Sequence, residues 1–203
     1  KNFYNESPKS FQDKSPINIA MTKIYSILND YKDMLFHLEK IIKSGNFLPY
    51  NLCNYGYWRC FDKSWSQDKF FEYGKFVDNS LIKYPEDQLI KLTSKKNKKI
   101  NLGILSADLN SGHAITYFLK TILLNYNKED IEIYLFSNQT NDNNISTKIT
   151  DLVHKTTNIS KLSELRALNK IREFNLDVMI DVMGYTSKNR IGLFKNRIAK
   201  KQI

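Results

Sequence analysis

The chain has little cysteine, glycine or proline: two, seven and four residues among 203. Two cysteines, Cys53 and Cys60, cannot by themselves form a disulfide scaffold or a four-ligand zinc site, which favours a reducing, cytoplasmic compartment. No apolar run approaches the ~20 residues that a membrane-spanning helix requires. The first residues, Lys1 to Tyr4, lack the apolar centre of a secretion signal. We therefore expect a cytoplasmic protein with no membrane partner.

Arginine is also scarce, although the chain is basic, with a formal net charge of +10. Lysines carry most of the excess and are scattered along the sequence, with clusters at 95–99 and 200–201. A nucleic-acid-binding protein usually concentrates lysine and arginine on one face, often with aromatic residues between them. The pattern favours solvated lysines and a linker at 95–99, and a nucleic-acid-binding domain is the least favoured function.

The first half of the chain has helical patterning. Residues 1–16 are polar and rich in turn formers, which predicts a flexible tail. Between residues 17 and 42 apolar side chains recur every three or four positions, as on one face of an amphipathic helix. A capping pattern at 64–67 predicts the start of another helix, which continues to Leu81. Residues 17–99 are therefore predicted to form a helical linker region, and no catalytic motif is visible there.

An aromatic segment at 47–61 separates these helical stretches. Pro49 and Gly56 argue against a long helix within it. Its rings could stack on sugars or bases, but aromatic residues at this density more often belong to a hydrophobic core. We expect most of them to be packed rather than to bind a ligand.

Beyond residue 99, short apolar segments alternate with helical ones. Strands are expected at 100–106, 131–137 and 177–183, and helices at 114–124, 145–153 and 163–174, with a polar loop at 138–144. This alternation predicts an α/β fold, a Rossmann-like parallel sheet with right-handed crossovers. Ligands bind such sheets beyond the carboxyl ends of the strands. The polar residues that follow Ser106, Ser137 and Met183 are therefore the ones to consider for a site.

The segment that follows Ser106 is the richest of these strand ends. It contains Asp108, Asn110 and a glycine, and it leads to His113 at the start of a helix. A helix N-terminus favours anions and disfavours a protonated imidazole, so we expect a neutral His113 that accepts or polarises a proton. The alternative is that His113 only caps or packs the helix. The segment matches neither a GxGxxG motif nor a P-loop.

The other titratable residues give weaker signals. His154 follows the second crossover helix and is a second candidate, with packing as the alternative. His37 lies off the apolar stripe and is expected to be a surface or packing residue. Asp181, in the third strand, forms no acid–base pair that the sequence reveals. No metal site is expected, because no cluster of His and Cys residues accompanies the two cysteines.

Two blocks of this second half resemble a known family. The segments 102–108, 112–114 and 117–119 resemble the opening of the catalytic region in the O-GlcNAc transferase family, which includes plant SPINDLY-type proteins and bacterial tetratricopeptide-linked transferases. The block 177–186, with Gly184-Tyr185-Thr186 after its strand, is similar to a second region of that family. The match continues through 189–194 and 197–203, and His154 occupies the place of a family histidine between the blocks.

The resemblance implies that residues 100–203 are the N-terminal Rossmann-like lobe of a two-lobed GT-B glycosyltransferase, with the second lobe absent from the chain. It implies inverting transfer of a sugar, typically N-acetylglucosamine, from a UDP donor to Ser or Thr of a protein acceptor, without metal or cofactor. The donor is held mainly by the missing lobe. His113 and His154 match histidines of the family's cleft, and the candidates to line that cleft are Asp108, Asn110, Gly184, Tyr185 and Thr186. The alternative function is a protein-interaction module that retains the lobe without catalysis.

Overall fold

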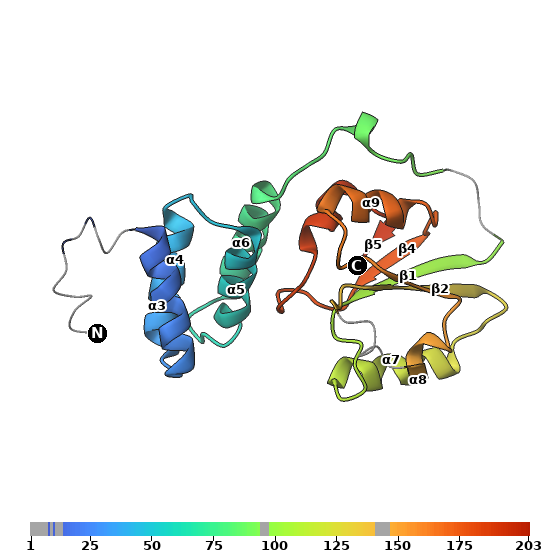
Figure 1. The fold of residues 1–203 in the computed structure, drawn as a ribbon, viewed down its shortest axis with the longest axis horizontal. Helices are drawn as coiled ribbons and strands as arrows, with labels where there is room; N and C mark the ends of the chain where they lie inside the picture. Colours follow the sequence, from blue (N-terminus) through green and yellow to red (C-terminus); the bar gives the residue numbers. More distant parts are fainter. Residues whose placement is uncertain (1–7, 9, 11–13, 94–97, 141–146) are drawn as a thin grey trace. The chain divides into compact units, whose positions relative to one another are not determined.

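The computed structural model describes residues 8, 10, 14–93, 98–140 and 147–203, which divide into two compact units (Figure 1). The first contains the chain up to Leu81 together with Tyr185–Ser187, and the second contains Ile82–Gly184 and Lys188–Ile203. Most of the predicted tail, of the lysine cluster and of the predicted polar loop lies outside the described residues.

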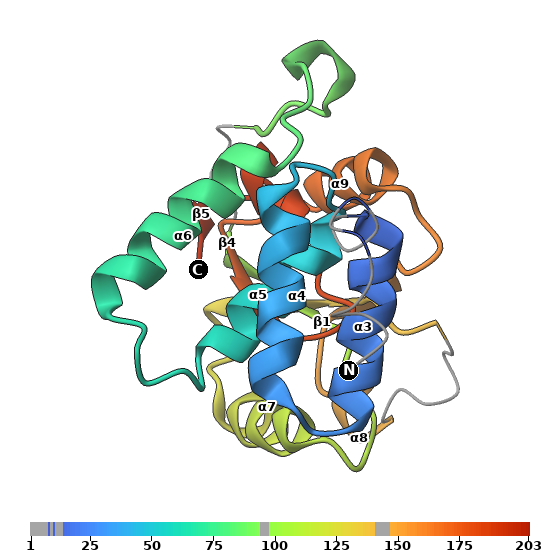
Figure 2. The same ribbon diagram turned by 90° about the vertical axis from the view of Figure 1, so that its left-hand side faces the viewer.

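The first unit is helical. Its described elements are α3 (Ser15–Ile27), α4 (Tyr31–Lys43), α5 (Pro49–Arg59) and α6 (Gln67–Ser80). Helices α3 and α4 run side by side (Figure 2). Helix α6 begins two residues later than the capping pattern at 64–67 predicted, because Ser66 and not Ser64 is its N-cap: the Ser66 hydroxyl accepts a hydrogen bond from the Lys69 N–H at 3.3 Å. The most deeply buried apolar side chains of this unit are Met34, Leu38, Ile41 and Leu52.

The stripe between residues 17 and 42 forms two helices, where the sequence predicted one. Asn29 adopts a left-handed conformation with φ of 55°, which Asn tolerates better than most residues and which no α-helix can contain. The Asp30 carboxylate then accepts the Asp33 N–H at 3.3 Å and caps α4. The chain therefore reverses between α3 and α4, and the predicted stripe is not the buried face, since its residues Ile24, Leu28 and Tyr31 are exposed. The side chains buried in this pair of helices are Asn18, Thr22, Tyr25, Met34, His37, Leu38 and Ile41.

The aromatic segment at 47–61 also differs from expectation, because it forms helix α5. Gly56 lies inside this helix, where aromatic rings approach its backbone closely. A Cβ atom on Gly56 would come within 2.8 Å of the Tyr185 ring and 2.9 Å of the Tyr73 ring. The glycine is thus explained by packing and not by a helix end. Burial of the segment is uneven, since Phe61 is 68% exposed.

His37 is a buried packing residue of this unit. Its ring stacks on Tyr25 with centroids 5.4 Å apart, and its Nδ1 atom lies 2.8 Å from Asn18 Oδ1. Burial, with a smaller contribution from the nearby Lys40 ammonium, lowers the pKa of His37 to about 4. The folded protein therefore holds this imidazole neutral, whereas the unfolded chain protonates it near its ordinary pKa of 6.5.

This difference predicts a loss of stability in mild acid. As pH falls from about 6.5 towards 4, the unfolded chain takes up a proton that folded His37 does not, so the free energy of unfolding should fall by on the order of 2 kcal/mol. Urea unfolding at pH 7 and at pH 4.5, monitored by tryptophan fluorescence, measures this change in the free energy of unfolding. His37→Phe should remove most of the pH dependence, and His154→Phe, at an exposed site, should not. Equal pH dependence in wild type and His37→Phe would contradict this assignment.

The second unit is built on a parallel sheet. Its strands are β1 (Ile100–Ser106), β2 (Ile131–Ser137), β3 (Lys155–Asn158), β4 (Val178–Asp181) and β5 (Lys201–Gln202), in the order β3-β2-β1-β4-β5. All neighbouring strands pair in parallel. This confirms the predicted Rossmann-like α/β fold. The sequence did not reveal the two edge strands, because β3 is polar and β5 has only two residues.

Helices cover both faces of this sheet (Figure 1). Helices α7 (Ala114–Asn125) and α8 (Thr147–Thr150) pack on one face, and α9 (Glu164–Arg172) and the 3₁₀ helix η3 (Ile191–Asn196) pack on the other. The first of these two cores contains Ile104, Leu119, Leu123, Ile133, Leu135 and Ile149. The second contains Leu105, Phe136, Ala167, Leu168, Ile171, Met179 and Leu193. The sheet is therefore shielded from water on both faces, as parallel sheets usually are.

The segment before β1 is fastened to this unit by two asparagine side chains. Asn196 accepts the Tyr84 N–H at 2.7 Å and donates to the Ile82 carbonyl at 2.9 Å. Asn169 in the same way contacts the N–H of Ile90 at 2.8 Å and the carbonyl of Gln88 at 2.9 Å. Each amide satisfies one backbone donor and one backbone acceptor of this segment, so residues 82–90, including the 3₁₀ helix η1 (Glu86–Gln88), pack with the sheet unit.

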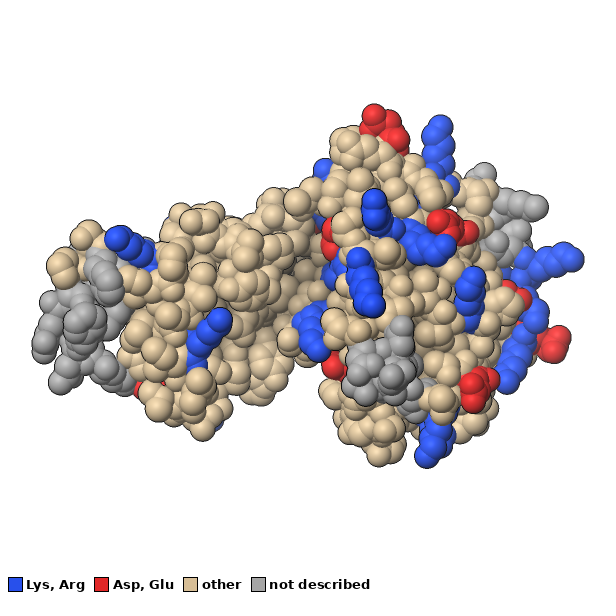
Figure 3. Space-filling view, viewed as in Figure 1, with Lys and Arg blue, Asp and Glu red and all other residues tan. Residues whose placement is uncertain are grey.

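Lysine and arginine side chains are spread over the second unit, with acidic side chains among them (Figure 3). Two of the lysines form ion pairs, Lys170 with Glu173 at 2.6 Å and Lys200 with Asp177 at 2.8 Å. Within the residues that the structure describes, every helix is too short or too polar to cross a membrane.

Candidate functional site

The strand ends of the second unit bring polar residues together at one edge of the sheet. Strands β1, β2 and β3 end in register, with Ser106 beside Ser137 and Ser137 beside Asn158. Strand β4 ends at Asp181, which pairs with Leu105 of β1. This carboxyl edge is where ligands bind parallel sheets, and the segments that follow β1 and β4 contain most of the predicted site residues.

The loop from β1 to α7 is held by its own hydrogen bonds. The Ser106 hydroxyl accepts the Asp108 N–H at 3.1 Å, and Asn110 Oδ1 accepts the Gly112 N–H at 3.2 Å. The buried Thr116 hydroxyl lies 2.7 Å from the carbonyl of Asn110 and 3.2 Å from that of Asp108. The amide of Asn110 thus shapes the loop, and the Asp108 carboxylate stays 30% exposed.

His113 is the N-cap of α7. Its Nδ1 atom accepts the Ile115 N–H at 3.4 Å, its Nε2 atom lies 3.8 Å from Asp108 Oδ2, and its side chain is 45% exposed. A neutral imidazole whose Nδ1 accepts a hydrogen bond carries its proton on Nε2. In this arrangement His113 donates from Nε2. To accept a proton at Nε2, the ring has to release the Ile115 N–H and move its own proton to Nδ1.

Asp181, the last residue of β4, stabilises the turn that follows this strand. Its carboxylate accepts the N–H groups of Met183 at 3.0 Å and Gly184 at 2.9 Å, and Gly184 takes the positive φ of 54° that this turn requires. Burial raises the pKa of Asp181, and the two N–H bonds oppose that shift. The Met183 sulfur accepts the Ala107 N–H at 3.1 Å and so links β4 to β1. The turn also ends β4 before Met183, which the sequence had placed inside the strand.

Tyr185 and Thr186 group with the helical unit, whereas Gly184 belongs to the sheet unit. The Tyr185 ring packs against Tyr73, with centroids 6.2 Å apart. Burial raises the pKa of Tyr185. In the described structure the aromatic ring of Tyr185 is therefore a packing element of the helices.

His154 lies at the opposite end of its strand from the candidate site. Its N–H donates to the Ile133 carbonyl at 2.8 Å, and its ring lies 5.2 Å from that of Tyr134. Because His154 directly precedes β3, the length of that strand separates it from the carboxyl edge at Asn158, roughly 3.3 Å per residue. The structure does not bring His154 beside His113.

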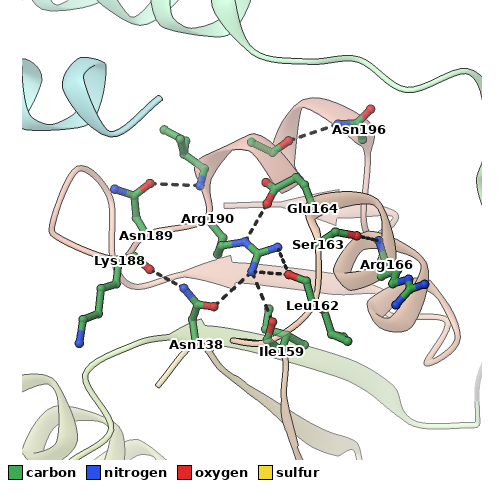
Figure 4. Close-up of polar contacts among 12 residues, drawn as sticks. Asn138, Ile159, Leu162, Ser163, Glu164, Arg166, Lys188, Asn189, Arg190 and Asn196 are labelled. Atoms are coloured by element: carbon green, nitrogen blue, oxygen red, sulfur yellow. Dashed lines mark hydrogen bonds and ion pairs between the residues drawn. The ribbon is translucent and has the colours of Figure 1, made fainter. Parts of the chain in front are cut away.

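Sequence reasoning missed several polar residues at the carboxyl edge. Arg190 and Glu164 form an ion pair with a distance of 2.7 Å, and Arg190 also contacts Asn138 (Figure 4). Arg190 belonged to a segment that carried the family resemblance, but only the fold places Glu164 beside it. Gln139 is buried, and its side-chain oxygen has no hydrogen-bond partner in the described structure.

Across the described ranges, no group of His, Cys, Asp and Glu residues is arranged to hold a metal ion. The described edge presents an imidazole, carboxylates, amides and a guanidinium. An exposed imidazole beside a carboxylate can donate or exchange a proton with a bound hydroxyl or phosphate oxygen.

Comparison with known proteins gives the family and the fold. A model described as glycosyl transferase family 41 matches residues 76–203, more than half of the chain. A solved mutant of the O-GlcNAc transferase of Thermobaculum terrenum is similar with a TM-score of 0.77 and 12% identity, covering 94% of this chain and 36% of that one. This likeness confirms the predicted helices and GT-B lobe, and the chain spans little more than a third of that protein's length. The comparison with curated proteins finds no match.

Proposed function

The chain belongs to glycosyl transferase family 41, and from this we propose that it is the acceptor-side lobe of an enzyme that transfers a sugar from a UDP donor to Ser or Thr of proteins. The family match over residues 76–203 carries the proposal. We expect N-acetylglucosamine as the sugar, because the similar solved structure is described as an O-GlcNAc transferase. The free cysteines Cys53 and Cys60 suit a reducing compartment such as the cytoplasm.

In this proposal the UDP-sugar is held mainly by a second lobe, outside the 203 residues. The similar transferase is far longer than this chain, which covers 36% of it. Positioning and charge stabilisation supply most of the acceleration of a group transfer, and both require a held donor. The 203-residue chain by itself should therefore bind UDP-N-acetylglucosamine weakly and transfer sugar slowly.

His113 is the residue of this lobe that we assign to the reaction. During transfer a bond forms between the acceptor oxygen and the sugar C1, the bond from C1 to the diphosphate oxygen breaks and UDP leaves, and the proton of the acceptor hydroxyl passes to the released diphosphate or to water. The exposed Nε2–H of His113 can donate to an oxygen that gains negative charge in this step. A role as base requires the other tautomer, which gives up the capping contact to Ile115.

The experiment compares the 203-residue chain with the product of the longest reading frame that contains it. The longer protein, with UDP-N-acetylglucosamine and a panel of peptide acceptors, should release UDP and add one N-acetylhexosamine mass to Ser or Thr. The shorter chain should bind the donor with a Kd above about 1 mM by calorimetry. Micromolar binding to the shorter chain would overturn the assignment of the donor to a second lobe. Absence of transfer by the longer protein with every UDP-sugar tested would favour the interaction module.

A further inference from the structure

Arg190 joins three loops at the carboxyl edge of the sheet (Figure 4). Its Nη1 atom donates to Asn138 Oδ1 at 3.3 Å, to the Ile159 carbonyl at 3.4 Å and to the Leu162 carbonyl at 3.3 Å. Its Nη2 atom donates to the same Leu162 carbonyl at 3.3 Å. Arg190 itself lies in the segment that follows β4, and its guanidinium contacts the segments that follow β2 and β3. The side chain therefore connects three loops.

Glu164 fixes this guanidinium in place. Its Oε2 atom accepts the Arg190 Nε–H at 2.7 Å, and the Arg190 side chain is 12% exposed. Burial raises the pKa of Glu164, and Arg190 opposes this rise by favouring the charged carboxylate. Gly192 leaves room for the carboxylate, since a Cβ atom there would lie 2.6 Å from Glu164 Oε1. The pair is thus held by packing as well as by charge.

Asn138 connects Arg190 to the candidate site. Its side-chain amide donates to the carbonyl of Lys188, a residue with a left-handed φ of 61°, at 2.7 Å. Its backbone N–H donates to the Ser106 carbonyl at 2.9 Å. Ser106 in turn holds the N–H of Asp108, whose carboxylate faces His113. A continuous set of polar contacts therefore runs from Arg190 to the loop that presents His113.

We propose that Arg190 is a positioning residue, which sets the geometry of the Asp108–His113 loop through Asn138 without contacting substrate. The inference rests on the proposed function, because it assigns a further residue to the same site at the carboxyl edge of the sheet. The planar guanidinium is required because several acceptors lie around it in fixed directions, and a lysine ammonium keeps the charge but not this geometry. A shift of about 1 Å in a reacting group can lower turnover by up to about 10²-fold.

The test uses Arg190→Lys and Asn138→Ala, with Arg166→Lys as the matched control on an exposed arginine of α9. In the longer protein, we expect Arg190→Lys to lower kcat by about 10- to 10²-fold per folded molecule and to leave the KM for UDP-sugar within about twofold. Asn138→Ala removes the side chain that contacts Arg190 and the Lys188 carbonyl but keeps the backbone bond to Ser106. It should act in the same direction even if Arg190→Lys folds poorly. Arg166→Lys should keep the wild-type kcat.

A second readout does not depend on activity. In the 203-residue chain, the amide NMR signals of Asp108, Gly112 and Ile115 should move in both test variants and stay in place in Arg166→Lys. Unmoved amides, or an unchanged kcat in an active longer protein, would overturn the positioning role. If the wild-type longer protein shows no transfer, the proposed function fails. The amide signals alone then decide whether Arg190 sets the geometry of the Asp108–His113 loop.

Discussion

Replacing His113 by Ala in a longer protein that transfers sugar should lower kcat by at least about 10²-fold. The imidazole lies at the carboxyl edge of the sheet, is 45% exposed and has Asp108 Oδ2 3.8 Å from its Nε2 atom. Its removal takes away the exposed imidazole whose Nε2–H can donate to an oxygen that gains negative charge during transfer. The strand before it and the helix after it keep their own hydrogen bonds. Steady-state rates of UDP release, corrected for the folded fraction, measure the effect.

The capping role of His113 requires its own control. The bond from Ile115 N–H to Nδ1 is long, at 3.4 Å, so its loss should lower the free energy of unfolding by no more than about 1 kcal/mol. His113→Asn keeps a side-chain acceptor suited to an N-cap but has no imidazole. We expect His113→Asn to have wild-type stability and to remain as slow as His113→Ala. Recovery of both stability and turnover in His113→Asn would make His113 a structural cap only.

Gly103→Ala should be the most damaging small substitution in the sheet unit, with a loss of about 2–3 kcal/mol in the free energy of unfolding. Gly103 lies in the middle of β1. An added Cβ atom would come within 2.5 Å of Leu176 Cδ1 and of Met179 Sδ, and within 3.3 Å of Phe136 Cε2. All three neighbours are fully buried in one core, so none can turn towards solvent. Urea unfolding of the 203-residue chain measures the change.

A matched glycine and a compensating variant separate this clash from other effects of an added methyl group. Gly112→Ala, where the nearest atom to the new Cβ is 3.8 Å away, should change stability little. Gly103→Ala combined with Met179→Ala should be less destabilised than the sum of the two single changes, because the truncated side chain leaves room for the new methyl group. Full additivity of the two changes would show that the clash with Met179 does not cause the loss.

Much of the second unit was predictable from local patterns. The strands at 100–106 and 131–137 match β1 and β2 because their apolar runs are long enough to mark buried parallel strands. The third predicted strand is shorter in the structure, since both oxygens of Asp181 turn the chain back towards Met183 and Gly184. The polar strand β3 has no apolar run, and only its pairing with β2 reveals it.

The candidate site was predictable only in part. His113, Asp108 and Asn110 lie close together in sequence, so one loop brings them to the strand end. His154 is distant in sequence, and the direction of β3 places it at the other end of its strand. The contacts of Arg190 involve residues 26 to 52 positions away, which no local pattern encodes.

The sequence by itself determined the alternation of helices and strands, the Rossmann-like class, the family and the loop that ends at His113. These features depend on residues within a few positions of one another or on the order of short motifs, both of which are visible along the chain. Tertiary structure decided the burial of His37 and the ion pair between Arg190 and Glu164. Both depend on contacts between residues far apart in sequence, because buried polar groups must find their partners wherever the fold places them.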